Sequence, residues 1–199
     1  MNTLEKRIIE LSYRHGLTHI SSCLNCVNLI SDIYDKRQPE DPFVLDNGHA
    51  SLAHYVVLEK NGLCDAEEMI ERHGVHSSRD MEHGIWCSNG SLGQAATVAA
   101  GMALADKNRM VWLVTSDGAT MEGAYYEASR FANEKCPNLN VNIVFNGLGA
   151  YGEIDERNIA HYQNVTVYHV NQDYYPKFLR GLQGHYLKLN QEQYEELMA

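Results

Sequence analysis

Two short apolar segments in the middle of the chain, separated by a stretch with helical character, constrain the fold more than any other feature. The segments RMVWLV (109–114) and VNIVF (141–145) are rich in β-branched residues and carry few charges, which is typical of buried strands. Between them, MEGAYYEASRFANEK (121–135) has the length and composition of a helix. A strand, a helix and a second strand form a βαβ unit with parallel strands and a right-handed crossover. The sequence therefore predicts an α/β fold in which helices flank a parallel sheet.

Helices are also predicted over residues 4–15, 20–34, 65–74 and 92–105. Apolar residues recur every three or four positions in 20–34, and Gly16 follows 4–15, where a helix C-terminus commonly has glycine. The 65–74 segment has an aspartate as its N-cap, a glutamate three residues later and a glycine past its end. The 92–105 segment is rich in Gly and Ala, which allows close packing on a sheet or on another chain.

The composition fits one globular domain, residues 1–199, with a sizeable core, since 44% of the residues are hydrophobic and 21% are charged. The formal net charge of −10 argues against a nucleic-acid surface, which needs clustered Lys and Arg. No apolar stretch approaches the roughly 20 residues of a membrane-spanning helix, and the N-terminal residues MNTLEKRIIE carry charges where a signal peptide is apolar. We therefore expect no membrane association and a cytoplasmic protein.

The cysteines favour a reducing compartment, because there are five of them and they lack the spacing of a disulfide framework. Cys23 and Cys26 form the pattern CLNC, which also occurs in zinc sites. A zinc site normally needs a second pair, and this pair lies in a stretch with the apolar spacing of a helix. We therefore expect buried structural thiols at these two positions.

The two predicted strands end in polar residues that can share a site. Asp117 and Gly118 follow the first strand, and Asn146 follows the second. An Asp-Gly pair alone is a common turn. In a parallel βαβ unit, however, both strands end at the same edge of the sheet, where open α/β sheets bind ligands, so Asp117 and Asn146 should meet. Carboxylate and amide oxygens suit Mg²⁺ or Ca²⁺, and such a cation would bridge the protein to a bound diphosphate.

Four segments, in the order found in a known family, make this site more specific. Asp-Gly, then a helix, then Asn resembles the thiamine diphosphate fingerprint. DPFVLDNGHASLAHYVVL (41–58) looks like the RFVLSNGHGS segment of the transketolase family, SNGSLGQAATVAAGMALADK (88–107) like its TTGPLGQGxxxAVGMAxAEK segment, and HGLTHISSCLNCVNLISDIY (15–34) like its SGHxGxxxxxxDIxxxLY segment. The chain therefore resembles the transketolase family, which implies the thiamine diphosphate-binding fold of its diphosphate-binding domain.

The resemblance assigns residues at the diphosphate end of the site. It implies that Asp117, Asn146 and the main-chain carbonyl of Leu148 bind a Mg²⁺ or Ca²⁺ ion, and that Gly118 lets the backbone approach the diphosphate. The family usually has glycine before the aspartate, where Ser116 stands here. We expect serine to be tolerated provided that the backbone at this position is not left-handed.

The resemblance also implies the residues nearer the reaction. His19 matches the histidine that faces the reacting carbons, and His49 matches the one that contacts the diphosphate or the substrate. Gly90 and Leu92 match a loop that lines the aminopyrimidine of the cofactor. Glu122 matches an acid that hydrogen-bonds across the subunit interface. We expect His19, His49 and Glu122 to take part in catalysis.

The C-terminal part of the chain is shorter than the family pattern. After NVTVYHV the family normally continues through another helix and strand, whereas here a short segment leads to HYLKLNQEQYEEL (185–197). That last segment looks like the family's WHxxxPNxEEYE ending, so His185 matches a substrate-side histidine. The sequence assigns no role to His76 or His83.

Thiamine chemistry also needs a glutamate that activates the cofactor through its pyrimidine ring. In the family this residue belongs to a separate pyrimidine-binding domain, for which this chain has no counterpart. The resemblance therefore implies a partner chain, a transketolase-like C-terminal subunit that supplies the pyrimidine-binding and C-terminal domains. We expect the Gly/Ala-rich segment 92–105 and Glu122 to lie in an interface within a heterotetramer of two copies of each chain.

The resulting prediction is the diphosphate-binding subunit of a split, transketolase-like enzyme. Its reaction would transfer a two-carbon ketol unit from a ketose, phosphorylated or nucleotide-linked, to an aldehyde. Two alternatives stay open. The chain could be a subunit of another thiamine enzyme, such as an acyloin synthase, a relative of deoxyxylulose-phosphate synthase or a 2-oxo acid dehydrogenase component. It could also be a non-catalytic scaffold that has kept the fold, although a scaffold has no need of metal and diphosphate ligands.

Overall fold

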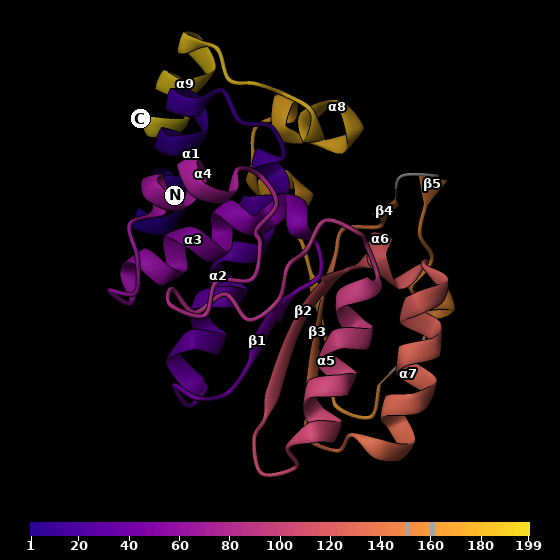
Figure 1. The fold of residues 1–199 in the computed structure, drawn as a ribbon. Coiled ribbons are helices and arrows are strands. Elements are labelled where there is room, and N and C mark those ends of the chain that lie inside the picture. Colours follow the sequence, from indigo (N-terminus) through magenta and orange to yellow (C-terminus); the bar gives the residue numbers. More distant parts are fainter. Residues whose placement is uncertain (150–151, 160–161) are drawn as a thin grey trace.

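The computed structural model describes residues 1–149, 152–159 and 162–199, and its centre is a four-stranded parallel sheet (Figure 1). The strands are β1 (Phe43–Leu45), β2 (Val111–Ser116), β3 (Leu139–Phe145) and β6 (Val165–His169), in the spatial order β1-β2-β3-β6. Each neighbouring pair of these strands is parallel. The predicted α/β fold is thus confirmed, and β2 and β3 are the two strands of the predicted βαβ unit.

Helices account for most of the remaining chain, and each helix predicted from the sequence is present. The α-helices are α1 (Thr3–His15), α2 (Ile20–Lys36), α3 (Ser51–Lys60), α4 (Ala66–His73), α5 (Gln94–Ala105), α6 (Asp117–Thr120), α7 (Gly123–Lys135), α8 (Gly181–His185) and α9 (Gln191–Met198). Short 3-10 turns lie at Gly48–Ala50, Glu156–Asn158, Gln172–Tyr174 and Lys177–Leu179, and β4 (Leu148–Gly149) pairs with β5 (Gly152–Glu153).

Two helices begin two residues later than the sequence pattern indicates, and the backbone explains both differences. Gly93 is the N-cap of α5 and has a φ of 83°, a left-handed conformation that ends the preceding loop. Leu92 therefore lies in that loop and not in the helix. Glu122 is the N-cap of α7 with an extended backbone, ψ 141°, so the helix begins at Gly123.

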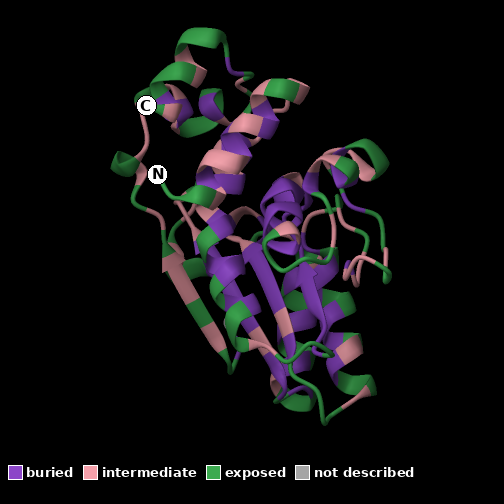
Figure 2. Ribbon diagram, turned by 90° about the vertical axis from the view of Figure 1, so that its left-hand side faces the viewer, coloured by how far each residue is buried: buried purple, intermediate pink, exposed green. Residues whose placement is uncertain are grey.

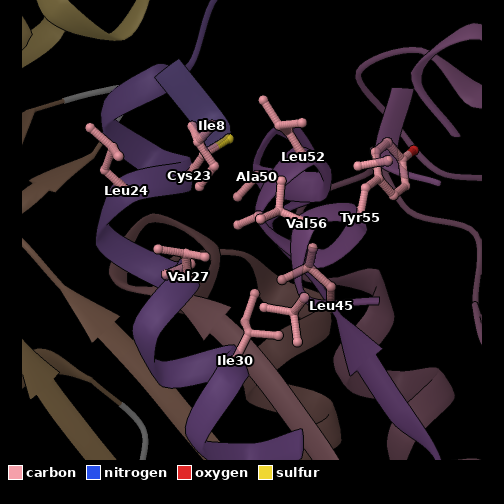
Figure 3. Packing of buried hydrophobic residues seen from close by; sticks show 14 of the residues in the cluster. Ile8, Cys23, Leu24, Val27, Ile30, Leu45, Ala50, Leu52, Tyr55 and Val56 are labelled. Carbon is pink, nitrogen blue, oxygen red and sulfur yellow. The ribbon is translucent and has the colours of Figure 1, made fainter. Parts of the chain in front are cut away.

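The sheet is covered on both faces. Helices α5 and α7 lie side by side on one face, and α2 and α3 lie on the other (Figure 1). Because side chains alternate along a strand, β1 directs Val44 toward the α5 and α7 layer, and Phe43 and Leu45 toward the α2 and α3 layer. Figure 3 shows Leu45 beside Ile30 of α2 and close to Val56 of α3. Because helices cover both faces of the sheet, β2 and β3 are buried on both sides, which explains their apolar sequences.

The edge strand β6 differs from the central strands. Each of its residues is intermediate or exposed, whereas most of β2 and β3 is buried (Figure 2). One side of β6 pairs with β3. Along the chain, the shortened segment that follows β6 runs through 3-10 turns into α8, which lies near the N-terminal end of α2.

The ends of α1 and α4 follow the predicted capping signals. Gly16 closes α1 with a φ of 59°, and its N–H donates to carbonyls of the last turn. The side chain of Asp65 accepts the N–H groups of Glu67 and Glu68 at the start of α4. Gly74 then ends that helix with a φ of 70°.

All five cysteines are free, and Cys23 and Cys26 are buried within α2, as the sequence predicts. Of the helices in the described part of the chain, none combines the length and the apolar character that crossing a membrane requires.

Candidate active site

A cavity of about 560 Å³ opens at the carboxyl end of the parallel sheet. Its walls come from the loops that follow β1, β2 and β3, from the start of α2 and from the segment around α8. Its lining includes nine of the ten residues that the sequence analysis matched to a site role, namely His19, His49, Gly90, Leu92, Asp117, Gly118, Asn146, Leu148 and His185. A volume of this size is ordinary for a small-molecule or cofactor site.

Asp117 joins the two loops that follow β2 and β3. One of its carboxylate oxygens accepts the backbone N–H groups of Asn146 at 2.8 Å and Gly147 at 2.7 Å, and the other accepts the N–H of Gly118 at 2.9 Å. Only 1% of Asp117 is exposed, and this burial raises the pKa of its carboxyl group, although the three N–H groups work in the opposite direction. The structure therefore confirms the prediction that Asp117 and Asn146 meet at the edge of the sheet.

The donor set at this junction suits a hard cation. The Asn146 side-chain oxygen accepts the N–H of Leu148 at 2.8 Å, so the Asn146 amide and the Leu148 backbone are held beside the Asp117 carboxylate. Of the described residues that line the cavity, none is Lys or Arg. A bound divalent cation would therefore supply the positive charge that an anionic ligand needs here and would compensate the buried carboxylate.

Ser116, which stands where the family pattern has glycine, fits without strain. Its φ is −107° and its ψ is 161°, an extended conformation open to any residue. Its side chain accepts the N–H of Ala119 and so caps the short helix α6. The condition under which serine was expected to be tolerated is therefore met.

Three histidines cluster in the lining of the same cavity. The ring centroids of His19 and His185 are 4.3 Å apart, those of His19 and His49 are 5.3 Å apart, and those of His49 and His185 are 5.1 Å apart. Burial, followed by the neighbouring imidazoles, lowers the pKa of His19 to about 4 and that of His49 to about 3, and burial lowers the pKa of His185. The cluster is therefore uncharged at neutral pH and offers hydrogen-bond donors and acceptors.

His19 is held in an unusual backbone conformation. It is the only non-glycine residue with a positive φ in the described part of the chain, with a φ of 65° at the N-cap of α2. Its N–H donates to the carbonyl of His185 at 2.8 Å, and its Nδ1 lies 2.6 Å from Thr18 Oγ1. Ser22 Oγ in turn lies 3.2 Å from His185 Nδ1. Left-handed backbone at a non-glycine residue is uncommon and gathers at functional sites, where the surrounding bonds hold it.

The loop after β1 and the loop that carries Gly90 are interlocked. A Cβ atom on Gly48 would lie 2.5 Å from Asn89 Oδ1 and 2.7 Å from the nitrogen of Gly90, so this close approach requires glycine. Ser51 Oγ donates to the Gly48 carbonyl at 2.7 Å, and Asn89 Nδ2 donates to Ser51 Oγ at 3.0 Å. The NGHAS and SNGS segments therefore act as one wall of the cavity.

Glu122 is the predicted site residue that is not among those lining the cavity. It is partly buried at the N-cap of α7, and a Cβ atom on Gly93 would lie 2.6 Å from Glu122 Cβ. Glu122 therefore lies behind the loop that carries Leu92. A bond to a second chain from this position stays a prediction.

The two histidines without a predicted role have different environments. His76 lines the cavity beside Gly90. His83 lies outside it, with Nδ1 2.9 Å from Asp80 Oδ2, an oxygen that is also 3.3 Å from His73 Nε2 and 3.4 Å from Arg72. Burial disfavours the charge of Asp80, but the hydrogen bond with His83 and the charge of that histidine lower the pKa of Asp80 overall. His83 thus helps to fix the surface loop between α4 and the Gly90 segment.

Sequence reasoning missed several residues of the site. Asn47, Ser22, Glu153 and Tyr186 line the cavity, and Asp46 lies directly behind it. Asn47 and Asp46 stand in the quoted segment 41–58, Ser22 in 15–34 and Tyr186 in 185–197, so those segments could have indicated them. Glu153 comes from a segment outside the quoted ones, and its place at the cavity depends on packing between distant parts of the chain.

Comparison with known protein families gives one match that spans most of the chain. A family model described as 1-deoxy-D-xylulose-5-phosphate synthase matches residues 1–183. The match takes in every residue of the cavity described above except Tyr186 and His185.

Curated relatives of the chain are transketolases and subunits of transketolases. A subunit of the apulose-4-phosphate transketolase of Phocaeicola vulgatus is 31% identical over 172 residues, which cover 76% of this chain and 61% of the relative. A 6-deoxy-6-sulfo-D-fructose transketolase subunit of Clostridium sp. (strain MSTE9) is 29% identical over 151 residues, covering 66% of this chain and 55% of the relative. The transketolase of Homo sapiens is 28% identical over 169 residues, covering 74% of this chain and 27% of the relative.

The aligned part of the chain thus spans about three fifths of the Phocaeicola vulgatus relative and about a quarter of the human protein. The family model covers well over half of the chain. The chain therefore belongs to the transketolase-type family that the 1-deoxy-D-xylulose-5-phosphate synthase model describes.

Proposed function

We propose that the chain is the diphosphate-binding subunit of a thiamine diphosphate-dependent, transketolase-like enzyme that transfers a two-carbon ketol unit from a ketose donor to an aldehyde acceptor. The observation that carries this proposal is the Asp117 junction: a buried carboxylate and the Asn146 amide meet at the carboxyl edge of the sheet, in the same cavity as three neutral histidines. The cavity thus offers oxygen ligands for a cation that can hold an anionic group, together with side chains that can form hydrogen bonds.

The residues present fit a diphosphate held through a Mg²⁺ or Ca²⁺ ion. Asp117, Asn146 and the carbonyl of Leu148 would hold the ion, since all three offer oxygen donors and the carboxylate is buried without a neighbouring Lys or Arg in the cavity lining of the described residues. Gly118 adds no side chain beside the diphosphate, and His49 would contact it. Thiamine diphosphate, when bound, supplies the carbon nucleophile on which the two-carbon unit is carried.

The histidines of the cavity would orient the sugar and move protons. Because their pKa values are lowered, His19 and His49 are neutral at pH 7 and can each accept a proton from a hydroxyl or donate a hydrogen bond to a carbonyl oxygen. His185 and His76 line the same space. We assign His19 to proton transfer at the substrate and His49 to the diphosphate side.

A partner subunit would complete the enzyme. Two of the relatives are named as subunits of transketolases. The α5 and α7 layer of this chain carries apolar residues with large exposed fractions, 40% for Val98, 45% for Leu104 and 44% for Phe131. Apolar surface of this kind favours a covered interface over a solvated face. We propose an α2β2 heterotetramer in which the partner supplies the pyrimidine-binding glutamate and Glu122 reaches across the interface.

One other thiamine reaction has specific support, because the family model is described as 1-deoxy-D-xylulose-5-phosphate synthase. An enzyme of that kind would act on a 2-oxo acid and release carbon dioxide, whereas ketol transfer from a sugar releases none. The relatives named as transketolases favour the sugar donor. Assaying the assembled enzyme for carbon dioxide from a 2-oxo acid separates the two reactions.

The free cysteines support a cytoplasmic location as a further part of the proposal. All five are unpaired, which fits a reducing compartment.

Calorimetric titration tests the cofactor and the metal together. Thiamine diphosphate is titrated into the chain mixed with its candidate partner, once with Mg²⁺ and once with a chelator. We expect saturable binding that is lost in the chelator, because the lining offers no other source of positive charge for the diphosphate. Equal affinity in both titrations contradicts the metal assignment, and absence of binding in both contradicts the proposed function.

A further inference from the structure

Asp46 is a completely buried carboxylate that lies behind the cavity and that none of the roles above uses. It follows β1 directly and is 0% exposed. One of its oxygens accepts the backbone N–H groups of Gly93 at 3.0 Å and Ala95 at 3.1 Å. The other accepts the hydroxyl of Thr115 at 2.9 Å. A single side chain thus joins the ends of β1 and β2 to the start of α5.

Each of the three segments that Asp46 joins carries a residue that lines the cavity. His49 follows Asp46 in the loop after β1, Leu92 immediately precedes Gly93, and Asp117 lies two residues beyond Thr115. The relative placement of these three walls therefore depends on the bonds of one carboxylate. A helix start, a strand end and a loop held together in this way cannot shift independently.

We infer that Asp46 is a positioning residue for the cavity: its ionised carboxylate holds the loops carrying His49, Leu92 and Asp117 in the arrangement that binds the diphosphate cofactor. The inference rests on the proposed function for the identity of the ligand. The bonds of Asp46 themselves do not depend on it.

The surroundings of Asp46 disfavour its charge but leave the carboxylate ionised at pH 7.5. Among the described residues, the charged or titratable groups that face it are Glu122 at the start of α7, Cys87 in the loop before α5, Tyr125 on α7 and Tyr162, and none of these four is a cation. Burial raises the pKa of Asp46 to about 6, against the opposing effect of its three hydrogen-bond partners. Of these partners the Thr115 hydroxyl favours the charge most, followed by the N–H groups at the start of α5.

A neutral side chain of the same shape cannot replace these bonds. An ionised carboxylate has two oxygens that only accept, and here both face donors. Asparagine has one acceptor, and its NH₂ group would face an N–H or O–H donor. The substitution leaves a buried donor without a partner, which costs about 1–3 kcal/mol.

Asp41 offers a matched control at the other end of β1. It is also buried, 7% exposed, and its carboxylate accepts the N–H of Gln38 at 3.1 Å and the indole N–H of Trp112 at 3.4 Å. It is not among the cavity-lining residues. Asp41→Asn therefore removes a buried carboxylate that flanks the same strand without touching the site.

The experiment measures the dissociation constant of thiamine diphosphate with excess Mg²⁺ for the wild-type chain, Asp46→Asn and Asp41→Asn, each with the partner subunit, at pH 7.5. We expect Asp46→Asn to bind at least tenfold more weakly than wild type, and Asp41→Asn to stay within about twofold.

Hydrogen exchange on the chain alone gives a readout that does not need the cofactor. The amides of Gly93 and Ala95 should lose protection in Asp46→Asn and keep it in Asp41→Asn. Equal losses of affinity in the two variants would overturn the inference. If Asp46→Asn does not fold, Thr115→Val, which removes one of the Asp46 bonds, decides: unchanged affinity overturns the inference, and a loss of about threefold or more supports it.

Different results would remove the proposed function and the role of Asp46. A wild-type chain that binds no thiamine diphosphate, while its Gly93 and Ala95 amides lose protection in Asp46→Asn as expected, removes the proposed function and supports the role of Asp46 in positioning the loops. Normal cofactor binding in Asp46→Asn leaves the proposed function intact and removes Asp46 as a positioning residue.

Discussion

The carboxylate of Asp117 accepts the backbone N–H of Asn146 at 2.8 Å, across the gap between the loops that follow β2 and β3. This bond fixes the side chain that follows one strand against the backbone that follows the next. It places two oxygen donors at the carboxyl edge of a parallel sheet, which is where such folds bind ligands. The metal and diphosphate end of the proposed site is built on this relationship.

Replacing Asp117 should abolish cofactor binding while the chain still folds. In Asp117→Asn the cation loses its charged ligand, so we expect the dissociation constant of thiamine diphosphate to rise at least 100-fold in the presence of Mg²⁺. Calorimetry on the chain with its partner measures this. Asp106→Asn, which alters a partly exposed aspartate that accepts the N–H of Asn108 at 3.0 Å, is the control and should leave the affinity unchanged. A loss shared by both variants would contradict the assignment.

His19 should act in turnover more than in cofactor affinity. Its ring lies within the histidine cluster and not at the Asp117 junction, so His19→Ala should lower the rate of ketol transfer about 100-fold or more and change the cofactor dissociation constant by about threefold at most. Steady-state rates at saturating cofactor measure the first effect. His169→Ala, which changes an exposed histidine on β6, is the control. A large loss of cofactor affinity with normal turnover at saturation would refute the role.

Much of the fold follows from local patterns in the sequence. The βαβ unit was predictable because β2 and β3 are apolar runs with a helix between them, and α4 because Asp65 and Gly74 mark its two ends. Helix α3 was not predicted, since it is buried on nearly every side and shows no polar face. Strand β1 has three residues, too few for a periodic signal.

The candidate site could be predicted where it depends on sheet topology. Asp117 and Asn146 meet because parallel strands end at one edge, which is a general rule. The contact between His19 and His185 joins residues from opposite ends of the chain, and no local pattern specifies it. The role of Asp46 was also hidden, because its partners at Gly93 and Ala95 are backbone N–H groups, which any residue but proline has.

Acid should destabilise the chain through buried His54. Burial, and then the charge of Arg37, lowers the pKa of His54 to about 3, and its Nε2 lies 2.7 Å from Tyr34 Oη. Below an ordinary value of 6.5 the unfolded chain takes up a proton at this residue and the folded chain does not, so stability falls as pH falls.

For one such histidine the free energy of unfolding should fall by up to about 1.4 kcal/mol per pH unit between pH 6 and 4. Urea denaturation at pH 7, 6 and 5 measures the slope. His54→Gln should be less stable at pH 7 and show a shallower slope, because the other buried histidines contribute equally to both proteins. Parallel slopes would rule out His54 as a source of the pH dependence.

A side chain at Gly48 should separate the two interlocked loops. Its Cβ would lie 2.5 Å from Asn89 Oδ1 and 2.7 Å from a backbone nitrogen, so Gly48→Ala should lower the free energy of unfolding by about 1–3 kcal/mol. Gly101→Ala is the control, since a Cβ there meets nothing within 4 Å on α5 and should stabilise the helix by about 0.5–1 kcal/mol. Chemical denaturation of both variants distinguishes this clash from a general effect of adding a methyl group.

Ketol transfer by the reconstituted enzyme tests whether this chain is the diphosphate-binding half of a split transketolase. The chain, its transketolase-like partner, and both together are each supplied with thiamine diphosphate, Mg²⁺, a ketose phosphate donor and an aldehyde acceptor, and the new ketose is quantified. We predict product only from the mixture, with none after Asp117→Asn is introduced. Transfer by the chain without a partner, or a mixture that assembles and binds the cofactor yet forms no product from any sugar pair, would contradict the proposal.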